Sequence, residues 1–287
     1  VDLQSQYQKI KNEVDEKVLN VMQSAMFING PEVQNFQKEL ENYLDVKHVI
    51  PCANGTDALQ IALMALHLEP GDEVITADFT FAATVEVVHL LKLKSVLVDV
   101  DYDTFNIDIE KLKAAITPKT KAIIPVHLFG QCANMEAVLE VAKEHNLYVI
   151  EDNCQGIGAD YKFADGTTKK SGTMGTLGVT SFFPSKNLGC YGDGGAIFTN
   201  DDDLAYKIRG IVNHGMYKRY YHDEVGVNSR LDSVQAAVLR VKLPLLDTYN
   251  AARRSAADYY DKAFANHPNI LTPKRAENST HVFHQYT

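Results

Sequence analysis

One lysine, Lys186, lies in a stretch from Thr180 to Gly195 that is rich in aromatic, proline and glycine residues. Such a neighbourhood can remove water from an ammonium group, and this disfavours the charged form. The neutral amine can then attack a carbonyl group and form a Schiff base. We therefore predict that Lys186 is a covalent catalyst. The alternative is a solvated loop lysine, since lysine side chains usually lie at the surface.

A carboxylate follows an apolar run in the middle of the chain. Asp152 comes directly after the run Tyr148 to Glu151, which has the composition of a buried strand. Ligands of parallel sheets gather at the carboxyl ends of the strands. We therefore expect the Asp152 carboxylate at the ligand-binding edge of a sheet. The alternatives are a helix cap and a metal ligand.

A glycine and a threonine lie where a predicted strand passes into a predicted helix, in the sequence Asn54-Gly55-Thr56. The first backbone N–H groups of a helix have no partner inside the helix, and the helix dipole is positive at this end. Both features favour an anion, and a phosphate binds well at such a position. We predict an anion site here. The alternative is a simple helix cap formed by Thr56.

The elements that must position these residues alternate along the chain from His48 onward. Strands are predicted at 48–52, 73–76, 95–100, 122–127 and 148–151, and helices at 56–66, 82–91, 109–115 and 135–145. Strands that alternate with helices indicate βαβ units. We therefore predict an α/β fold with a mostly parallel central sheet and helices on both of its faces.

Helices are also predicted near both ends of the chain. Residues 3–25 and 31–44 have the apolar spacing of amphipathic helices, and a long helical region at 232–265 is expected to bend near Pro244. Further strands are predicted at 181–183 and 196–199. Residues 281–286 have the composition of a strand that has no partner in the sequence.

The composition is that of an ordinary globular chain of 287 residues, with 45% hydrophobic and 23% charged residues. No apolar run has the length of a membrane span, and no signal pattern opens the sequence. The four cysteines form no Cys-x-x-Cys pair, so we expect a reducing, cytoplasmic setting without disulfides. A net charge of −9 argues against nucleic-acid binding, which requires basic residues.

Four segments resemble the DegT/DnrJ/EryC1/StrS family of sugar aminotransferases, which use pyridoxal phosphate (PLP). They are Cys52–Asp57, Glu151–Gln155, Ser181–Gly189 and Gly226–Asp232, and the similarity runs along almost the whole chain. The resemblance implies the aspartate-aminotransferase-like fold (PLP fold type I). It further implies a large PLP-binding domain at residues 1–245 and the start of a small C-terminal α/β domain at 246–287, which we expect to be completed by further chain.

The resemblance also implies which residues hold the phosphate and the ring of PLP. Gly55, Thr56 and Ser181 correspond to phosphate-binding residues of the family. Phe81 corresponds to an aromatic residue that stacks on the pyridine ring, although packing in the core is the usual place of a phenylalanine. Asn228 corresponds to a residue that reaches the cofactor phosphate of a partner subunit.

Four further residues have implied roles in chemistry or substrate binding. Asp152 would keep the pyridine nitrogen protonated, Gln155 would contact the ring hydroxyl, and Lys186 would bind PLP covalently. Arg230 would bind the substrate from the partner subunit, and the alternative for it is a loop before a helix capped by Asp232. A homodimer with shared active sites follows from these roles.

The implied function is the transfer of an amino group from an amino acid, glutamate, to a keto group of a nucleotide-linked sugar. The segments at Cys52, Gly189 and Gly226 are most similar to the branch that aminates C3 of UDP-linked 3-keto-N-acetylhexosaminuronic acids for cell-surface polysaccharides. The alternatives are a 4-aminotransferase acting on a 4-keto-6-deoxy sugar, and a non-catalytic regulator. A further alternative is a related PLP enzyme that acts on sugars, such as a dehydratase, but similar dehydratases have histidine in place of Lys186.

Other cofactors are not supported by the sequence. It contains neither the dinucleotide-binding Gly-x-Gly-x-x-Gly after its first strand nor a phosphate-binding Gly-x-x-x-x-Gly-Lys-[Ser/Thr]. His281 and His284 are three residues apart, a spacing that places them on opposite faces of a strand. We therefore expect no metal site.

Overall fold

The computed structural model of the chain describes residues 2–287. The chain forms two compact units, and each unit is built from two separate stretches of sequence. The first unit contains Val1–His67 and Val179–Leu246, and the second contains Leu68–Gly178 and Asp247–Thr287. The domain division predicted at residue 245 stays a prediction.

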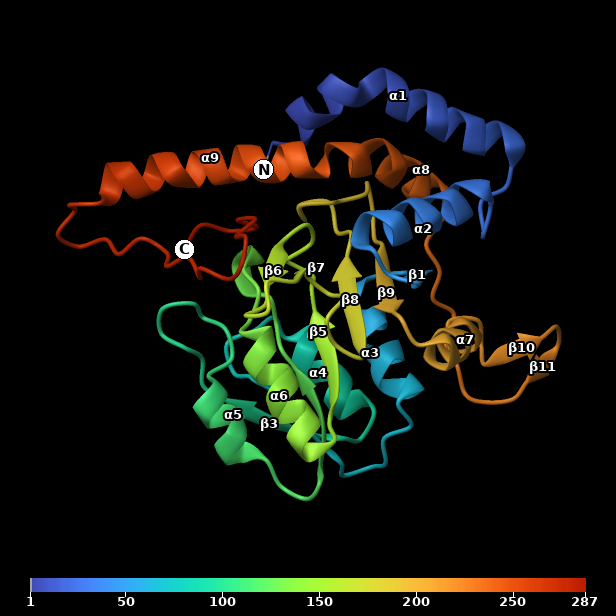
Figure 1. The fold of residues 1–287 in the computed structure, drawn as a ribbon. Coiled ribbons are helices and arrows are strands. Elements are labelled where there is room, and N and C mark those ends of the chain that lie inside the picture. Colours follow the sequence, from blue (N-terminus) through green and yellow to red (C-terminus); the bar gives the residue numbers. More distant parts are fainter. Residues whose placement is uncertain (1) are drawn as a thin grey trace. The chain divides into compact units, whose positions relative to one another are not determined.

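Three helices pack together in the first unit, as Figure 1 shows. They are α1 (Leu3–Ser24), α2 (Pro31–Leu44) and α8 (Ser233–Lys242). The apolar stripe of α1, with Ile10 and Val14, packs against Val238 and Val241 of α8. The predicted N-terminal amphipathic helices are therefore confirmed, and burial of their apolar faces explains their stability in the fold.

The strands of the first unit lie beside two further helices. β1 (His48–Cys52) pairs antiparallel with β9 (Gly195–Thr199). The remaining elements of this unit are α3 (Gly55–Ala65), α7 (Asp202–Ile211), the hairpin β10 (Met216–Lys218) and β11 (Tyr221–His222), and the short helix η2 (Leu243–Leu245). The helix η2 contains Pro244 and lies between α8 and α9, so the α-helical pattern is interrupted at the proline, and the predicted bend stays a prediction.

The second unit contains four parallel strands in the order β5-β4-β2-β3. Its strands are β2 (Glu73–Ala77), β3 (Lys94–Val98), β4 (Thr120–Ile124), β5 (Tyr148–Asp152) and the hairpin β6 (Asp160–Lys162) and β7 (Thr168–Lys170). Its helices are α4 (Ala83–Leu90), α5 (Ile109–Ala115), η1 (Leu128–Gly130), α6 (Met135–His145) and most of α9 (Leu246–Phe264).

The main sheet has seven strands in the order β1-β9-β8-β5-β4-β2-β3, where β8 is Leu177–Ser181. The order places β4 between β2 and β5 and so requires crossover connections, which α4, α5 and α6 supply. The predicted α/β fold with a mostly parallel sheet is therefore confirmed.

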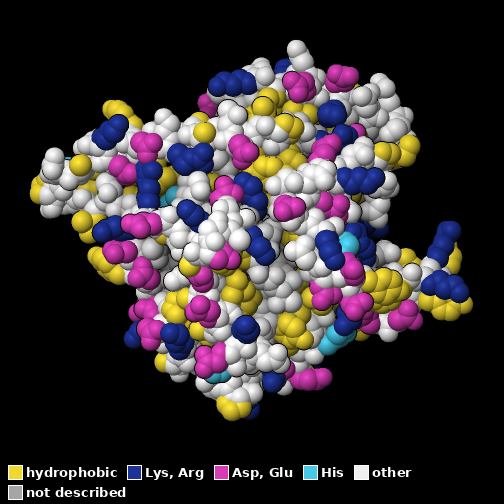
Figure 2. All heavy atoms as spheres, in the orientation of Figure 1, with side chains coloured by type: hydrophobic (Ala, Val, Ile, Leu, Met, Phe, Trp, Pro, Cys, Tyr) yellow, Lys and Arg dark blue, Asp and Glu magenta, His cyan; other side chains and the backbone are white. Residues whose placement is uncertain are grey.

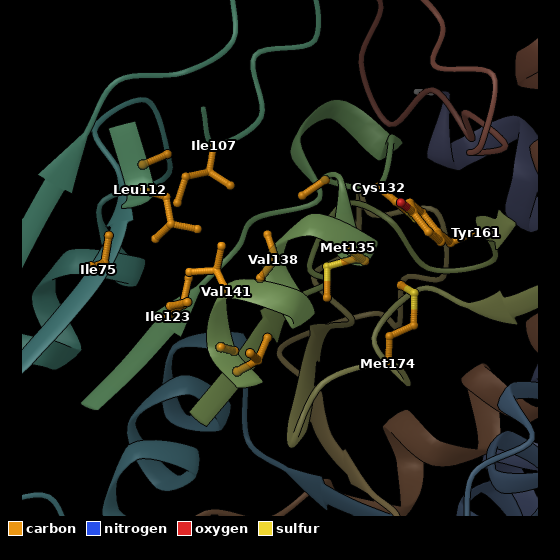
Figure 3. Close-up of a cluster of buried hydrophobic side chains, with 14 of the residues drawn as sticks. Ile75, Ile107, Leu112, Ile123, Cys132, Met135, Val138, Val141, Tyr161 and Met174 are labelled. Carbon is orange, nitrogen blue, oxygen red and sulfur yellow. The ribbon is translucent and has the colours of Figure 1, made fainter. Parts of the chain in front are cut away.

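The core of the second unit lies between its parallel strands and helix α6. Figure 3 shows Ile75 and Ile123 of the strands near Val138 and Val141 of α6, all of them fully or almost fully buried. Tyr161 of β6 belongs to the same core and is also fully buried. These side chains hold β2 and β4 against α6. Val149 of β5 belongs to the same cluster, and β5 ends at Asp152.

The strand predicted at residues 281–286 is wrong. Residues 281–286 have no strand geometry and lie alongside η1, where the Val282 N–H donates to the Gly130 carbonyl at 2.8 Å. Phe283 has a φ of 45°, which an extended strand does not allow. Its N–H turns back to Nδ1 of His281 at 3.0 Å.

The strand predicted at residues 181–183 is shifted. In the structure β8 begins at Leu177 and ends at Ser181. Phe182 and Phe183 therefore belong to the loop that follows, which carries Lys186. The apolar character of these two phenylalanines misled the prediction, since Phe182 packs edge-on against Phe36 of α2 with ring centres 5.3 Å apart.

The described residues contain no helix that is both long and apolar enough to cross a membrane. Figure 2 shows basic and acidic side chains interspersed over the face in view. Proteins that bind nucleic acids instead present a stripe or patch of basic residues. The charge distribution on this face is therefore that of an ordinary mixed surface.

Candidate active site

The loop after β8 is closed at its base, and Lys186 lies within it. The Cys190 N–H donates to the Phe182 carbonyl at 2.8 Å, and the Lys186 N–H donates to the Phe183 carbonyl at 2.9 Å. We call residues 182–190 the lysine loop. The Lys186 side chain is partly exposed, and its amine has no hydrogen-bond or ion-pair partner within residues 2–287. This leaves the amine available for reaction.

The N-terminus of α3 provides two backbone donors. Asn54 is the N-cap, and its side-chain oxygen accepts the Asp57 N–H at 2.8 Å. The N–H groups of Gly55 and Thr56 have no acceptor in the described part of the chain. The cap position is therefore filled by Asn54 and not by Thr56, and the two free donors suit an anion.

A glycine allows strand β9 to approach this helix terminus closely. A Cβ atom on Gly195 would lie 2.4 Å from the Asn54 carbonyl oxygen and 3.0 Å from the Gly55 nitrogen. Real Cβ atoms do not approach backbone atoms to 2.4 Å. Only glycine therefore fits here without moving the N-terminus of α3.

The segment before α8 is fixed to the same helix terminus by Ser229, which the sequence analysis did not single out. The fully buried Ser229 hydroxyl accepts the Ala53 N–H at 3.0 Å and donates to the Asp57 carboxylate at 2.6 Å. Its neighbours Asn228 and Arg230 are exposed and partly buried, respectively. Alternate residues of an extended segment point to opposite sides, so these two side chains point away from α3.

The remaining predicted first-unit residue, Ser181, ends β8. Its hydroxyl accepts the Phe183 N–H at 3.2 Å, and the side chain is partly exposed. A hydroxyl has one donor and two acceptor lone pairs, so the Ser181 O–H can still donate to an anion. Ser181, Gly55, Thr56, Lys186, Asn228 and Arg230 all belong to the first unit.

In the second unit, Asp152 ends β5 and is buried. One carboxylate oxygen accepts the hydroxyl of Thr84 in α4 at 2.9 Å, and the other accepts the Cys154 N–H at 3.2 Å. Thr84 is fully buried, and its own oxygen lies 3.0 Å from the Thr80 hydroxyl. These contacts orient the carboxylate and leave further acceptor capacity on its oxygens.

The preceding residue, Glu151, points to the opposite side of β5. Its fully buried carboxylate accepts three backbone N–H groups of residues 172–175 and lies 2.8 Å from Nε2 of His127. His127 Nδ1 accepts the Ala133 N–H at 3.2 Å, so the ring proton is on Nε2 and donates to Glu151. Glu151 is therefore fully occupied with holding the backbone, whereas Asp152 is not.

Gln155 and Phe81 lie in loops of the second unit. The Gln155 side-chain oxygen accepts the Phe129 N–H at 2.8 Å, which leaves the amide NH₂ group without an acceptor in residues 2–287. Phe81 precedes α4 and is 69% exposed, so it is not a core residue of this chain. An exposed ring on a strand-to-helix loop is available for stacking.

The four cysteines are free thiols, and three of them are buried. Burial raises the pKa of Cys52, that of Cys132 to about 12 and that of Cys190 to about 11. A protonated thiol is a poor nucleophile. These three cysteines are therefore structural residues, and Lys186 is the better candidate for covalent chemistry.

Comparison with known proteins identifies the family. A sequence model of the DegT/DnrJ/EryC1/StrS aminotransferase family matches residues 8–287. The chain belongs to this family. The predicted resemblance, the class of PLP-dependent sugar aminotransferases and the PLP cofactor are thereby confirmed. At the coarser level the predicted activity, that of a nucleotide-sugar aminotransferase, is also confirmed.

Two curated relatives of the family match the whole chain. The UDP-2-acetamido-2-deoxy-3-oxo-D-glucuronate aminotransferase of Pseudomonas aeruginosa is 50% identical over 287 residues, which are 100% of this chain and 78% of that protein. The pleiotropic regulatory protein of Geobacillus stearothermophilus is 49% identical over 289 residues, covering 100% of this chain and 76% of that protein.

Two solved structures share the fold. A DegT DnrJ EryC1 StrS aminotransferase from Brucella abortus has a TM-score of 0.95 and 42% identity, covering 100% of this chain and 77% of that one. NtdA from Bacillus subtilis, with the cofactor PMP bound, has a TM-score of 0.88 and 35% identity, covering 97% of this chain and 63% of that one.

The groups found in this chain fit the cofactor. PLP carries a phosphate, a ring nitrogen that is protonated when active, a ring hydroxyl and an aldehyde that reacts with an amine. The first unit supplies the unpartnered N–H groups of Gly55 and Thr56 and the free amine of Lys186. The second unit supplies the buried carboxylate of Asp152 and the free amide of Gln155.

Proposed function

We propose that this chain is the aminotransferase for C3 of a UDP-linked 3-keto-N-acetylhexosaminuronic acid, with glutamate as the amino donor. The observation that carries the proposal is the 50% identity, over the whole chain, to the Pseudomonas aeruginosa UDP-2-acetamido-2-deoxy-3-oxo-D-glucuronate aminotransferase. A second relative, at 43% identity over 287 residues, is named a UDP-N-acetyl-3-dehydro-alpha-D-glucosamine 3-aminotransferase. The product would serve cell-surface polysaccharide synthesis.

The cofactor residues have distinct proposed tasks. Gly55 and Thr56 bind the phosphate through their backbone N–H groups, and Ser181 adds its hydroxyl. Phe81 stacks on the ring and Gln155 donates its amide to the ring hydroxyl. These residues fix the cofactor so that the reacting groups stay aligned.

Asp152 and Lys186 carry the chemistry. PLP, when bound, supplies a ring that accepts electrons from the carbon that loses its proton. The Asp152 carboxylate, oriented by Thr84, keeps the proton on the ring nitrogen and thereby sustains this electron uptake. Lys186 would hold the cofactor covalently. Its amine, when free, would remove and return the proton at the reacting carbon.

We further propose that the active protein is a homodimer with shared sites. Asn228 and Arg230 point away from the α3 terminus of their own chain, as a residue that serves a neighbour would. The residue Ile28 is bridged to Asp232, two positions after Arg230, and belongs to an exposed apolar segment. The exposed side chains of this segment and of the end of α1 are Leu19, Met22, Met26, Phe27 and Ile28. A partner subunit would cover them.

Arg230 is the residue that we propose recognises the uronate. This guanidinium is partly buried and has no acidic partner within residues 2–287. An arginine can bind a carboxylate with two parallel charge-assisted hydrogen bonds. A uronate carries such a carboxylate at C6, whereas a neutral hexose does not.

The test compares a 3-keto uronate with the matched neutral 3-keto sugar. Loss of one member of a buried charged pair costs about 2 to 5 kcal/mol, so Arg230→Ala lowers kcat/KM for the uronate by roughly 30-fold or more. The neutral sugar loses much less. Arg230→Lys keeps the charge without the two-pronged geometry and gives an intermediate loss.

Two outcomes would change the proposal. Equal losses on both substrates would remove the role of Arg230 in binding the carboxylate. Preference for a 4-keto-6-deoxy sugar would favour a 4-aminotransferase. That second candidate has support from 44% identity over 261 residues to the GDP-perosamine synthase of Caulobacter vibrioides, which covers 90% of this chain.

A further inference from the structure

A buried lysine outside the predicted site contacts the lysine loop. Lys242 is the last residue of α8 and only 2% exposed. Its amine donates to the Gly189 carbonyl at 2.7 Å. No carboxylate forms an ion pair with Lys242 in the described part of the chain. Burial accordingly lowers its pKa to about 8.

The other neighbours of this amine are uncharged at neutral pH. The amine lies 4.3 Å from the centre of the Tyr191 ring, which faces it in a cation–π contact. The Cys190 thiol is nearby, and its raised pKa keeps it protonated. Tyr191 also packs edge-on against Tyr7 of α1, with ring centres 6.0 Å apart. Within residues 2–287, the Gly189 carbonyl is therefore the one hydrogen-bond acceptor of the Lys242 amine.

The carbonyl that Lys242 binds belongs to Gly189, where the two ends of the lysine loop lie in close contact. Gly189 comes three residues after Lys186, and a Cβ atom on it would lie 2.4 Å from the Pro184 carbonyl oxygen. The two ends of the turn that carries Lys186 thus cross in direct contact. A hydrogen bond that holds Gly189 consequently limits the movement of the whole turn.

Helix α8 holds the segment after the loop as well. The Tyr191 N–H donates to the Gln235 side chain at 2.8 Å. Two residues of α8, Gln235 and Lys242, therefore bind the segment 189–191. An apolar residue in place of Lys242 would avoid the cost of burying an amine without a counter-charge. What the lysine adds is a charged donor to a loop carbonyl, a stronger hydrogen bond than a neutral donor makes.

We propose that Lys242 is a positioning residue for Lys186, which acts by fixing the lysine loop through the Gly189 carbonyl. The proposal rests on the function of Lys186 given above. It assigns Lys242 no contact with the substrate or the cofactor. Its effect reaches the reaction through the backbone of residues 186–189.

Hydrogen exchange of the cofactor-free protein tests the proposal without any catalytic assay. In Lys242→Met, the amides of residues 183 and 185–190, which include the bonded N–H groups of Lys186 and Cys190, exchange about tenfold faster or more. The amides of α3 and α7 keep their wild-type rates. Mass spectrometry of peptides that cover these segments reads out both.

Arg240→Met provides the matched control. Arg240 lies on the same helix and binds Glu32 and Glu39 of α2, so its loss weakens α8 packing without touching the loop. The proposal requires unchanged exchange of residues 183–190 in this variant. Equal acceleration in both variants, or no acceleration in Lys242→Met, would overturn it.

A second variant covers the case in which Lys242→Met does not fold. Lys242→Arg keeps a charged donor, and the proposal requires loop exchange within about threefold of the wild-type rate. A folded Lys242→Arg with an unprotected loop overturns the positioning role, and so does failure of both variants to fold, because Lys242 would then serve the unit as a whole.

The reconstituted enzyme gives an independent readout. Lys242→Met lowers kcat by about tenfold with KM nearly unchanged, because a misplaced Lys186 impairs chemistry more than binding. Arg240→Met leaves both constants near the wild-type values. If the wild type lacked aminotransferase activity while the loop exchange behaved as stated, the proposed function would fail and the contact of Lys242 with the loop would stand.

Discussion

Neighbouring carboxylates on β5 differ in what their surroundings leave them free to do. Glu151 accepts three backbone N–H groups and the His127 ring, so its lone pairs are committed to holding residues 172–175. Asp152 has two donors, Thr84 and the Cys154 N–H. A carboxylate has about four acceptor positions, so Asp152 retains capacity for a protonated ring nitrogen.

A buried histidine, His281, makes the stability of the fold depend on pH. His281 is buried, and its ring stacks on that of Phe283 with ring centres 3.8 Å apart. Its Nδ1 accepts the Phe283 N–H. Burial, with the Arg275 charge, lowers its pKa from 6.5 to about 4. The unfolded chain therefore binds a proton below pH 6.5 that the folded chain rejects. The free energy of unfolding falls by about 2 to 3 kcal/mol as the pH drops from 6.5 to 4.

Urea unfolding at several pH values checks this prediction. His281→Asn keeps an acceptor for the Phe283 N–H and cannot be protonated, so it removes this part of the pH dependence. The exposed His67 has a positive φ, which asparagine tolerates, and His67→Asn is the control that keeps the wild-type dependence. A His281→Asn protein with an unchanged slope between pH 4 and 6.5 would disprove the assignment.

Sequence could predict single residues where a local pattern marks them. The position of Asp152 at the end of an apolar strand and the free N–H groups at the Gly55 turn follow from strand and helix geometry. Thr84 and Ser229 could not be predicted, because each contacts a residue far away in the chain, 68 and 172 positions distant. A serine between Asn228 and Arg230 in a family motif was the one signal for Ser229.

At the scale of elements, the contact between β9 and the N-terminus of α3 fixes the geometry of the proposed anion site. Gly195→Ala places a Cβ atom against the Asn54 carbonyl, so the helix terminus must shift. Overpacking of this kind costs about 1 to 3 kcal/mol of stability. We expect the affinity for PLP to fall by about tenfold or more as well, because the Gly55 and Thr56 N–H groups move.

Titration of the cofactor-free protein with PLP, together with urea unfolding, measures both effects. Gly166→Ala is the control, since Gly166 has a φ of +88° with no atom near its missing Cβ. That variant loses about 1 kcal/mol through backbone strain and keeps its PLP affinity. Unaltered PLP affinity in Gly195→Ala would refute the proposed phosphate site.

Elements with a clear period were predictable and irregular ones were not. The parallel strands and α5 and α6 were predicted within a few residues, because apolar runs and helix spacing are local signals. The strand prediction for residues 281–286 failed because hydrogen bonds to η1 fix the backbone there and the His281 ring accepts the Phe283 N–H. Tertiary contacts of this kind override a strand-like composition.

At the scale of the whole molecule, the proposed shared sites allow complementation between inactive chains. Lys186→Ala lacks the covalent residue, and a chain with both Asn228→Ala and Arg230→Ala lacks the residues given to the partner. A mixed dimer contains one site with all three residues intact. We expect activity to return to about a quarter of the wild-type value in an equal mixture, since half of the dimers are mixed and each has one complete site.

Mass measurement of the mixed dimer must first confirm that subunits have exchanged. Each variant incubated alone is the control and stays inactive. Persistent inactivity of a mixture in which mixed dimers are present would mean that each chain builds its site alone, and the roles of Asn228 and Arg230 would have to be revised.

The central claim, that Lys186 is the residue that binds PLP covalently, has a direct measurement. The protein is loaded with PLP, reduced with borohydride and digested, and the peptides are weighed by mass spectrometry. We predict that the cofactor mass lies on Lys186, is absent from folded Lys186→Ala, and persists in Lys38→Ala, where an exposed lysine of α2 is removed. Cofactor on another lysine, such as Lys242, or on the same peptide of Lys186→Ala, would contradict the account.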